Sequence, residues 1–371
     1  MSPSLRFPEF TGEWEECVLG DYGKVVTGNT PPTKDIENYE NGTYLWASPA
    51  DLGTHKLISE TKTKLSSKGF TKTRPLSKGS VLVTCIGSTI GKTGMATREM
   101  STNQQINSIV VNENNDNEFV YYVVQSAFPH YLSSIAVQAV PIISKSSFEL
   151  LPSKRPSLQE QNKIGIFLSL LDERISTQHR LIEDLKKLRC AVSNKLFQSV
   201  KGVAIPLSCI SNIVKGKQIN GDFLADVGEY YVMNGGTDPS GYYDNYNVEA
   251  NTISISEGGN SCGYVQFNRM PFWSGGHCYT IQDIVSDVET LYLYHYLKSK
   301  EDSIMKLRIG TGLPNIQKKD LAEFKVIIPA IEQQRTISNI LSLLERKNEI
   351  EGQLLIAMRT EKQYLLRQMF I

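Results

Sequence analysis

Apolar residues recur at alternating steps of three and four along two long stretches of the chain. This spacing places them on one face of an α-helix and is typical of a coiled-coil seam. The seam positions of the first stretch are Leu168, Leu171, Ile175, Gln178, Ile182, Leu185, Arg189, Val192 and Leu196. Those of the second stretch are Leu341, Leu344, Asn348, Glu351, Leu355, Met358, Lys362, Leu365 and Met369. Each helix is expected to run for about forty residues, or roughly 60 Å.

Four polar residues within the two seams indicate how the helices pair. A parallel, in-register pair would set Arg189 beside Lys362, and two like charges in a desolvated layer are unfavourable. An antiparallel pair instead sets Arg189 against Glu351 and Gln178 against Lys362. The pattern therefore predicts an antiparallel coiled coil whose register is fixed by these two polar layers. The alternative is two independent helices, each packed on its own domain.

The two helices are copies of one segment. Residues 156–197 and 329–370 match at a constant offset of 173 with no gap. At an offset of 172 the match extends into the preceding segments, where Gly91 aligns with Gly263. A period this long is too large for a solenoid, so each copy is expected to be a whole domain with its helix. Antiparallel copies are related by a pseudo-two-fold axis, which suits the reading of two half-sites on a duplex.

The segments outside the helices contain short β-rich runs, Gly and Pro turns and one amphipathic stretch in each half. Strands are predicted at 79–84, 106–111, 251–256 and 278–284, and shorter helices at 119–126 and 291–298. The predicted fold class is α+β: two α+β domains alternate with two long helices that pair as an antiparallel coiled coil, in a pseudo-two-fold internal repeat. The predicted boundaries are 1–155, 156–200, 201–328 and 329–371.

Composition limits the partners that the chain can have. The 371 residues include 39 basic and 39 acidic side chains, so any contact with nucleic acid has to come from local patches. There is no run of eighteen apolar residues and no signal-peptide pattern, and a soluble, cytoplasmic protein without membrane contact is expected. The six cysteines form no Cys-x-x-Cys pair, so they are expected to be buried free thiols.

Three segments resemble catalytic or nucleotide-binding motifs but lack groups that those motifs need. Residues 30–33 (TPPT) have neither the Asp or Asn nor the aromatic residue of an adenine methyltransferase motif. Residues 87–93 (GSTIGKT) have three residues between the glycines, whereas a P-loop needs four. His277, Cys278 and Cys262 match no standard spacing of metal ligands. The sequence therefore predicts no catalytic residue and no metal or cofactor site in this chain.

Local features favour contact with double-stranded DNA. Residues 53–78 contain six lysines and one arginine against a single acid, Glu60, and such a stretch suits phosphate contacts, although a solvated loop would look similar. Reading of bases needs amides, hydroxyls and basic side chains on loops close to the groove. The expected DNA-binding residues are Thr30, Lys34, Ser48, Lys62, Lys64, Arg74, Ser88, Lys92, Asn103, Gln105, Lys217, Asn234, Thr237, Tyr242, Asn260, Ser261 and His277.

The order and duplication of these motifs resemble the specificity subunit of type I restriction-modification systems. The resemblance rests on PSLQEQNKI at 156–164 and PAIEQQRTI at 329–337, each of which opens a long helix after a diverged domain. Supporting motifs are TGNTPP at 27–32, NGGTDPSGY at 234–242 and EGGNSCGYV at 257–265. The resemblance covers essentially the whole chain.

The resemblance implies that residues 1–155 and 201–328 are target recognition domains, each reading one half of a split DNA sequence. Residues 156–200 and 329–371 would be spacer helices that set the gap between the halves. The chain would be non-catalytic and would dock two methyltransferase subunits, which bind S-adenosylmethionine, and two restriction subunits, which use ATP and Mg. Two rival interpretations are a stand-alone enzyme, for which no convergent catalytic set is found, and a scaffold of two adaptor domains, which leaves the lysine-rich segment unexplained.

Overall fold

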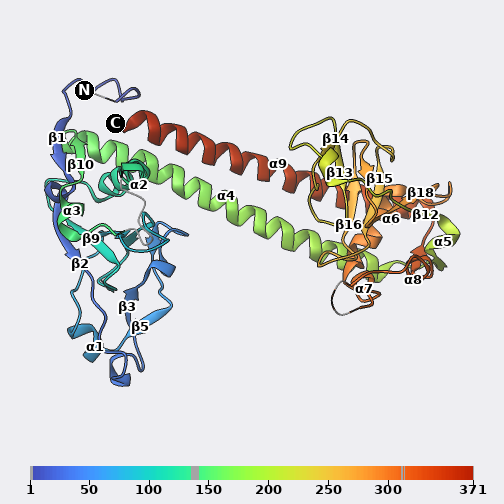
Figure 1. The fold of residues 1–371 in the computed structure, drawn as a ribbon, viewed down its shortest axis with the longest axis horizontal. Coiled ribbons are helices and arrows are strands. Elements are labelled where there is room, and N and C mark those ends of the chain that lie inside the picture. Colours follow the sequence, from blue (N-terminus) through green and yellow to red (C-terminus); the bar gives the residue numbers. More distant parts are fainter. Residues whose placement is uncertain (1–2, 135–141, 311, 313, 371) are drawn as a thin grey trace. The chain divides into compact units, whose positions relative to one another are not determined.

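The computed structural model describes residues 3–134, 142–310, 312 and 314–370, and it divides into two compact units. The first unit comprises Met1–Gln178 and Leu354–Ile371, and the second comprises His179–Gln353. Each unit therefore holds a globular part together with one portion of each of two long helices, α4 (Leu158–Ser199) and α9 (Ile331–Met369) (Figure 1).

In the described residues, the globular part of the first unit contains three sheets and three α-helices. Its sheets have the strand orders β2-β9-β6-β7-β4, β5-β3-β8 and β1-β10. The strands are β1 (Glu15–Val18), β2 (Gly23–Thr27), β3 (Tyr44–Ala47), β4 (Leu57–Ile58), β5 (Thr63–Leu65), β6 (Val81–Thr84), β7 (Thr93–Ala96), β8 (Ser101–Thr102), β9 (Ile106–Val111) and β10 (Pro152–Arg155). The helices are α1 (Ser67–Thr71), α2 (Asn117–Ser134) and α3 (Lys145–Glu149), and the 3-10 turns are η1 (Leu19–Tyr22), η2 (Ile36–Asn38) and η3 (Pro49–Asp51).

The globular part of the second unit follows the same plan. Its sheets have the strand orders β12-β18-β15-β16, β14-β13-β17 and β11-β19. The strands are β11 (Val203–Pro206), β12 (Asn212–Lys215), β13 (Tyr230–Met233), β14 (Tyr242–Tyr243), β15 (Thr252–Ser256), β16 (Val265–Asn268), β17 (Trp273–Ser274), β18 (Cys278–Gln282) and β19 (Lys325–Ile328). The helices are α5 (Leu207–Ile210), α6 (Thr290–Ser299), α7 (Glu301–Met305) and α8 (Lys318–Ala322), with the 3-10 turn η4 (Gly221–Phe223).

The internal repeat is present at the level of topology. The order β2-β9-β6-β7 corresponds to β12-β18-β15-β16, and every neighbouring pair in both is antiparallel. The small sheets also correspond, because β3 pairs parallel with β8 as β13 does with β17. The predicted α+β class is confirmed, and each strand or helix predicted inside the globular parts coincides with β6, β9, α2, β15, β18 or α6.

Each unit buries its own apolar core around a helix that lies between the main sheet and the long helices. In the first unit this is α2, whose Phe119 and Tyr122 pack in one cluster with Leu168 of α4 and Met369 of α9. In the second unit the equivalent helix α6 packs with Phe197 of α4. Within the described ranges, no helix combines the length and the apolar content needed to cross a membrane.

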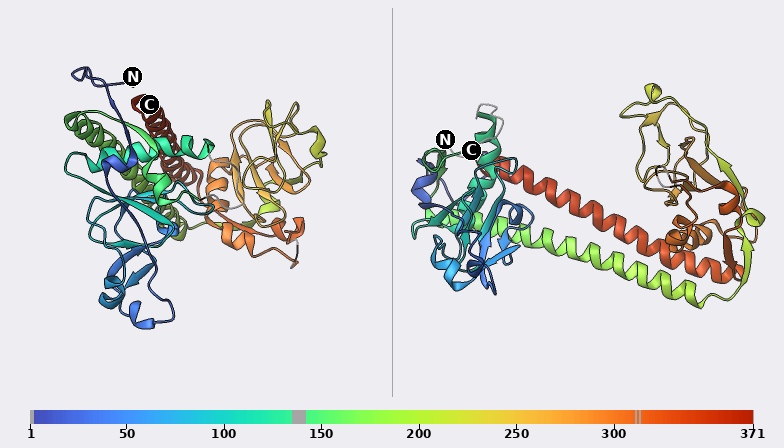
Figure 2. Two further views of the ribbon diagram at one scale, coloured as in Figure 1. Left: turned by 60° about the vertical axis from the view of Figure 1, so that its left-hand side comes forward. Right: turned by 60° about the horizontal axis from the view of Figure 1, so that its bottom comes forward.

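The α4 and α9 segments run side by side in opposite directions within each unit (Figure 2). In the first unit Lys362 Nζ lies 2.6 Å from Asp172 Oδ1, and in the second Arg189 Nη1 lies 3.1 Å from Glu345 Oε1. The antiparallel pairing is therefore confirmed, and all predicted seam positions are buried or half-buried.

The structure gives Arg189 an ion pair with Glu345 and Lys362 an ion pair with Asp172. The predicted layers of Arg189 with Glu351 and of Gln178 with Lys362 stay a prediction. Long basic side chains at seam positions reach acids that flank the seam, as e and g positions do in coiled coils.

The two ion pairs are copies of one polar junction between the globular part of a unit and its helices. Asp172 and Glu345 match at the offset of 173, as do Arg189 and Lys362. A tyrosine of the packed helix donates to each acid: Tyr122 Oη lies 2.6 Å from Asp172 Oδ2, and Tyr294 Oη lies 2.9 Å from Glu345 Oε1. Burial, reinforced by the neighbouring carboxylate, raises the pKa of Tyr122 and of Tyr294 well above the ordinary value. Each globular part is therefore fixed to the helix pair by the same tyrosine–acid–cation group.

Candidate nucleic-acid interface

Four loops meet at one edge of each unit. In the first unit they are A1 (28–34), B1 (48–51), C1 (86–92) and D1 (103–105), and in the second they are A2 (216–220), B2 (234–238), C2 (258–264) and D2 (275–277). In the first unit, loops A1 and D1 are tied through the main chain to strands of the small sheet. Loop A1 is joined to strand β8 by Asn29 N donating to Thr102 O, and D1 to β3 by Asn103 N donating to Ala47 O.

The main chain of these loops is the same in both units. Loop C1 closes with Gly91 N donating to Thr84 O at 2.9 Å, and C2 with Gly263 N donating to Ser256 O at 2.8 Å. The next contact is also copied, because Cys85 N donates to Gln105 O as Glu257 N does to His277 O. Two glycines in each C loop have positive φ, at positions 87, 91, 259 and 263, where a side chain would strain the backbone. The glycine repeat in the sequence thus marks a shared turn geometry.

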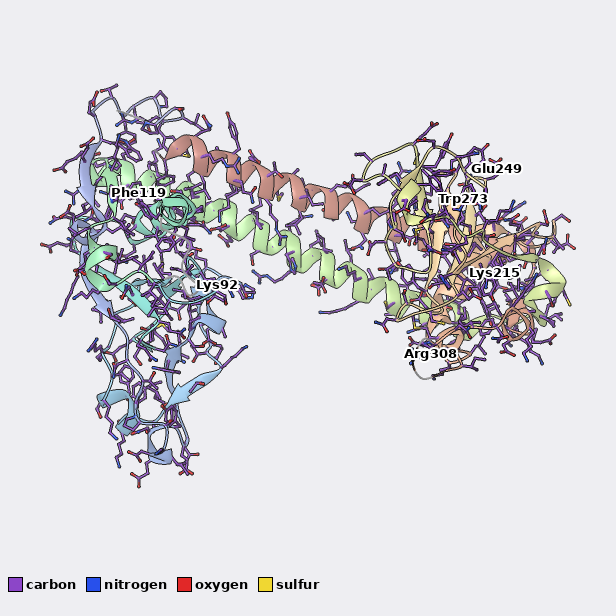
Figure 3. All side chains as sticks on the ribbon, viewed as in Figure 1. Lys92, Phe119, Lys215, Glu249, Trp273 and Arg308 are labelled. Carbon is purple, nitrogen blue, oxygen red and sulfur yellow. The ribbon has the colours of Figure 1, made fainter. Side chains whose placement is uncertain are left out.

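The side chains on this shared framework differ. Loop C1 ends at Lys92, whose stem packs against Gly53, whereas the equivalent position in C2 is Tyr264 (Figure 3 labels Lys92). Lys298 Nζ lies 3.9 Å from the centre of the Tyr264 ring and so holds it by a cation–π contact. The last residue of the D loops is Gln105 in one unit and His277 in the other. The two edges therefore have one geometry and different chemistry.

Both A loops are supported by an indole, but from different strands. Trp46 of β3 donates from Nε1 to Asn29 O at 3.1 Å. Trp273 of β17 donates from Nε1 to Lys217 O at 2.9 Å (Figure 3). Asn29 and Lys217 occupy the same place in the two units, because each donates its backbone N–H to the carbonyl of the residue that ends the parallel strand. The A loop thus has the same position in both units, although the tryptophan that is hydrogen-bonded to it comes from a different strand in each.

Most first-unit residues expected to contact DNA lie on the four loops. Thr30, Lys34, Ser48, Ser88, Lys92, Asn103 and Gln105 are all on loops A1 to D1, and Arg74 joins them by donating from Nη1 to Thr27 O at 2.8 Å. Asn103 is buried, and its amide oxygen accepts from Gln105 N at 3.0 Å, so its side chain builds the turn of D1. Gln104 was missed by the sequence analysis, although it is exposed at the tip of D1 and accepts from Thr30 Oγ1 at 2.5 Å.

The second-unit residues are distributed in a similar way. Lys217, Asn234, Thr237, Asn260, Ser261 and His277 lie on loops A2 to D2. Asn234 Oδ1 accepts from His277 N at 3.1 Å, so B2 and D2 are tied together by this side chain. Tyr242 is placed elsewhere, on β14 and opposite Tyr231 of β13. Its role in DNA contact stays a prediction.

The lysine-rich segment is largely engaged within its own unit. Lys56 forms an ion pair with Glu118, Lys64 with Glu60, Lys68 with Glu37 and Lys72 with Asp35. Lys56 is also hydrogen-bonded to Ser169 of α4, which makes it part of the junction with the helices. Lys62 is exposed and lies immediately before β5, the strand that contains Lys64. The run of lysines thus overstates the number of cations that are available to phosphates.

Two of the buried cysteines are poor nucleophiles. Burial raises the pKa of the Cys85 thiol to about 12 and that of the Cys278 thiol to about 11, so both stay protonated at neutral pH. All six cysteines are free, but the expectation that they are buried is wrong for Cys190 and Cys209, which are exposed on α4 and α5. Among the described residues, no group of three or more His, Cys, Asp or Glu side chains has the arrangement of a metal site.

An open pocket of about 550 Å³ lies between loops B2 and C2 in the second unit. Gly236 and Thr237 form one wall, Asn260 and Ser261 form another, and Tyr264 lies between them. The sequence analysis predicted Thr237, Asn260 and Ser261 as DNA contacts, and the structure brings them to one cavity. It missed Tyr264, for which the substitution of the aligned Lys92 in the repeat was the available signal.

Two equivalent α+β units, each with four loops of shared backbone and divergent side chains, define an internally duplicated protein. The chain belongs to the family of the type I restriction modification DNA specificity domain, whose model matches residues 11–187 and 205–358. This confirms the resemblance drawn from the helix-opening motifs and the duplicated loops.

Individual relatives match smaller parts of the chain. It is 33% identical over 145 residues to S.MpnORF638P of Mycoplasma pneumoniae, which has a provisional name as a type I specificity subunit, with 38% of each chain covered. It is 29% identical over 182 residues to the specificity subunit of the type I restriction enzyme MjaIX of Methanocaldococcus jannaschii, with 47% of this chain and 42% of the relative covered. The chain thus spans about two fifths of the length of the curated relatives it matches.

The fold as a whole is similar to a solved structure. The crystal structure of an S subunit of a type I restriction-modification system from M. genitalium has a TM-score of 0.71 and 22% identity, with 100% of this chain and 99% of that chain covered. At this level of identity the likeness concerns the fold.

Proposed function

We propose that this chain is the DNA-specificity subunit of a type I restriction-modification complex, in which each unit reads one half of a bipartite target. The observation that supports this most directly is the pair of loop sets A1 to D1 and A2 to D2. Their backbone hydrogen bonds are copied, yet their exposed side chains differ. A shared catalytic site would require the same side chains in both units, whereas two readers of different sequences require different ones.

The exposed side chains of these loops suit the edges of base pairs. Gln104 and the half-buried Gln105 offer amides, which can bond to adenine N6 and N7, and Asn260 offers the same group in the second unit. Lys92 offers a cation for guanine O6 and N7 or for a phosphate. The chain would contribute recognition alone, and methyl transfer and cleavage would take place on partner subunits.

Helices α4 and α9 would set the gap between the two half-sites. α4 is a single helix of 42 residues and α9 one of 39, so each would extend on the order of 60 Å at 1.5 Å per residue. The duplicated tyrosine–acid–cation junctions support this role, because they hold each recognition part on the helices in the same manner.

Two equivalent apolar patches support the docking of two copies of one partner. Phe167 and Leu170 on α4 match Ile340 and Leu343 on α9 at the offset of 173, and all four are exposed. The leucines are 59% and 68% exposed, which is unusual for a large apolar side chain repeated at the same place. We propose that each patch binds one methyltransferase subunit, which holds S-adenosylmethionine, and that two restriction subunits using ATP and Mg join the assembly.

Paired loop variants test the division of labour between the units. The chain is prepared in complex with its methyltransferase, and binding is measured to the duplex that the complex methylates. Gln104→Ala with Gln105→Ala is expected to relax base preference in one half-site, and Asn260→Ala with Ser261→Ala in the other. Each double variant should weaken binding to the full site by roughly tenfold or more. Equal relaxation of both halves by either variant would overturn the proposal.

A further inference from the structure

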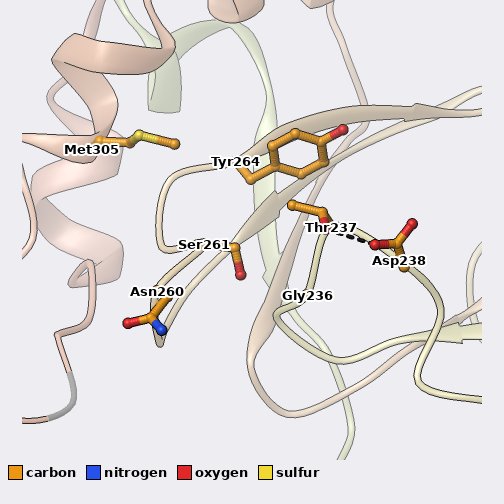
Figure 4. Close-up of a pocket in the computed structure, with 7 residues that line it drawn as sticks. All are labelled: Gly236, Thr237, Asp238, Asn260, Ser261, Tyr264 and Met305. Carbon is orange, nitrogen blue, oxygen red and sulfur yellow. Dashed lines mark hydrogen bonds between the residues drawn. The ribbon is translucent and has the colours of Figure 1, made fainter. Parts of the chain in front are cut away.

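The pocket between loops B2 and C2 has a carboxylate at its rim. Asp238 lies beside Thr237 on B2, across the pocket from Asn260 and Ser261 of C2 (Figure 4). Thr237 Oγ1 donates to Asp238 Oδ2 at 2.9 Å, so this oxygen is already engaged and the carboxylate is oriented. The other oxygen, Oδ1, has no hydrogen bond or ion pair to any residue in the described part of the chain.

The corresponding loop of the first unit, B1, contains Asp51, and both carboxylate oxygens of Asp51 are hydrogen-bonded within the unit. Asp51 Oδ2 accepts from Ser48 N and from Ser48 Oγ, at 2.8 and 2.7 Å. Its second oxygen accepts from Lys62 N at 2.8 Å. Asp51 thus builds loop B1, whereas Asp238 keeps an acceptor directed away from the protein framework. The difference indicates that Asp238 has a role outside the folding of its loop.

A free carboxylate on a DNA-facing edge is unfavourable unless DNA supplies a donor. Phosphates place a negative charge about every 1.7 Å along the duplex and repel it. Among the major-groove edges, guanine presents only acceptors and thymine an acceptor and a methyl group, while adenine presents its amine beside the N7 acceptor. Cytosine presents the N4 amine without a neighbouring acceptor, and Asp is a known acceptor for that amine. Cytosine is therefore the base that a lone carboxylate oxygen favours.

We propose that Asp238 is a specificity-determining residue that accepts a hydrogen bond from the N4 amine of one cytosine in the half-site read by the second unit. Thr237 positions the carboxylate through its hydroxyl. Tyr264, held by Lys298, lines the same pocket. The inference rests on the proposed function, because it requires that loops B2 and C2 face the major groove.

The test is a chemical double-mutant cycle on the complex of this chain with its methyltransferase. Binding is measured to the methylated-site duplex, with each cytosine of the second half-site replaced in turn by deoxyzebularine, a pyrimidin-2-one nucleoside that lacks only the amine. The wild-type complex is expected to lose roughly tenfold in affinity at one position. Asp238→Ala is expected to lose less than about threefold at that position and to keep its preferences elsewhere.

Two further variants make the outcome specific. Asp244→Ala removes an exposed acid of the same unit outside the pocket. It controls for the loss of one negative charge, and it should leave unchanged the ratio of affinities for the cytosine and deoxyzebularine duplexes at every position. Thr237→Val should reduce discrimination at the same cytosine only. Equal amine dependence in the wild type and Asp238→Ala, or a second half-site without an amine-dependent cytosine, would overturn the inference. Absence of sequence preference in both halves of the wild type would instead overturn the proposed function.

Discussion

The junction between Asp172 and Lys362 permits a quantitative test of the pairing between α4 and α9 in the first unit. Both side chains are mostly buried, at 21% and 15% exposure, and their charged atoms are 2.6 Å apart. At an effective dielectric constant of about 20 the Coulomb attraction is on the order of 6 kcal/mol, and desolvation of the two groups offsets most of it. Exposed pairs contribute about 1 kcal/mol or less, whereas breaking a buried pair costs about 3 to 5 kcal/mol. We therefore expect Lys362→Met to cost about 2 kcal/mol.

The assay is a double-mutant cycle with Asp172→Asn, Lys362→Met and the double variant. Amide hydrogen exchange read by mass spectrometry follows each unit separately, which is needed because a chain of two units need not unfold in one step. The expected coupling energy is about 1 to 2 kcal/mol in α2, α4 and α9 of the first unit. The matched control is Lys186 with Glu183, an exposed pair on the same helix, for which the expected coupling is below about 0.5 kcal/mol.

A coupling between Asp172 and Lys362 no larger than that of the control would refute this pairing of α4 with α9. The same cycle on Arg189 and Glu345 should give a similar value in the second unit, because the junction is duplicated and the two pairs share no partner. Charge reversal of Glu345 should destabilise the second unit, and reversal of Arg189 in the same chain should restore part of the loss.

Three other predictions concern stability and assembly. Burial lowers the pKa of His295 to about 4 from about 6.5 in the unfolded chain, so the unfolded state binds more protons below pH 6.5. The free energy of unfolding of the second unit should therefore fall by about 2 kcal/mol between pH 7 and pH 5. His295→Gln should flatten this pH dependence in hydrogen-exchange measurements. Gly263→Ala should lower Tm more than Gly259→Ala, since both residues have positive φ but only the added methyl group of the former would lie 2.9 Å from the backbone of a neighbouring helix. Leu170→Glu and Leu343→Glu should each remove one methyltransferase subunit from the complex, as measured by native mass spectrometry. Because both leucines are exposed, each variant should keep its Tm within about 1 °C of the wild type. Retention of both subunits would contradict the proposed docking sites.

The repetitive parts of the fold could be predicted because a repeated structure leaves a repeated pattern in the sequence. The seam of α4 and α9 follows directly from apolar spacing, and the glycines of loops C1 and C2 mark a turn that only glycine adopts easily. The acids that pair with the basic seam residues could not be predicted in this way. Heptad spacing defines which face is buried, but it does not show that a flexible basic side chain such as Arg189 reaches an acid outside the seam.

The sequence also did not show which polar side chains are engaged in hydrogen bonds or ion pairs within the protein. Asn103 looks like a base-reading amide, yet its side chain is used to close a turn, while the adjacent Gln104 is exposed. The lysines of residues 53–78 look like a phosphate-binding patch, yet several are paired with acids such as Glu37 that come from other segments. Such pairing depends on tertiary contacts between distant segments, which a local pattern does not contain.

The central claim is that this chain gives a methyltransferase a two-part DNA specificity. Methylome sequencing of cells that express the chain together with its methyltransferase, compared with cells that express the methyltransferase alone, tests it most directly. The account predicts a split adenine-methylation motif, with two fixed halves and a constant gap, that appears only when the chain is present. Identical methylation in the two strains would contradict it.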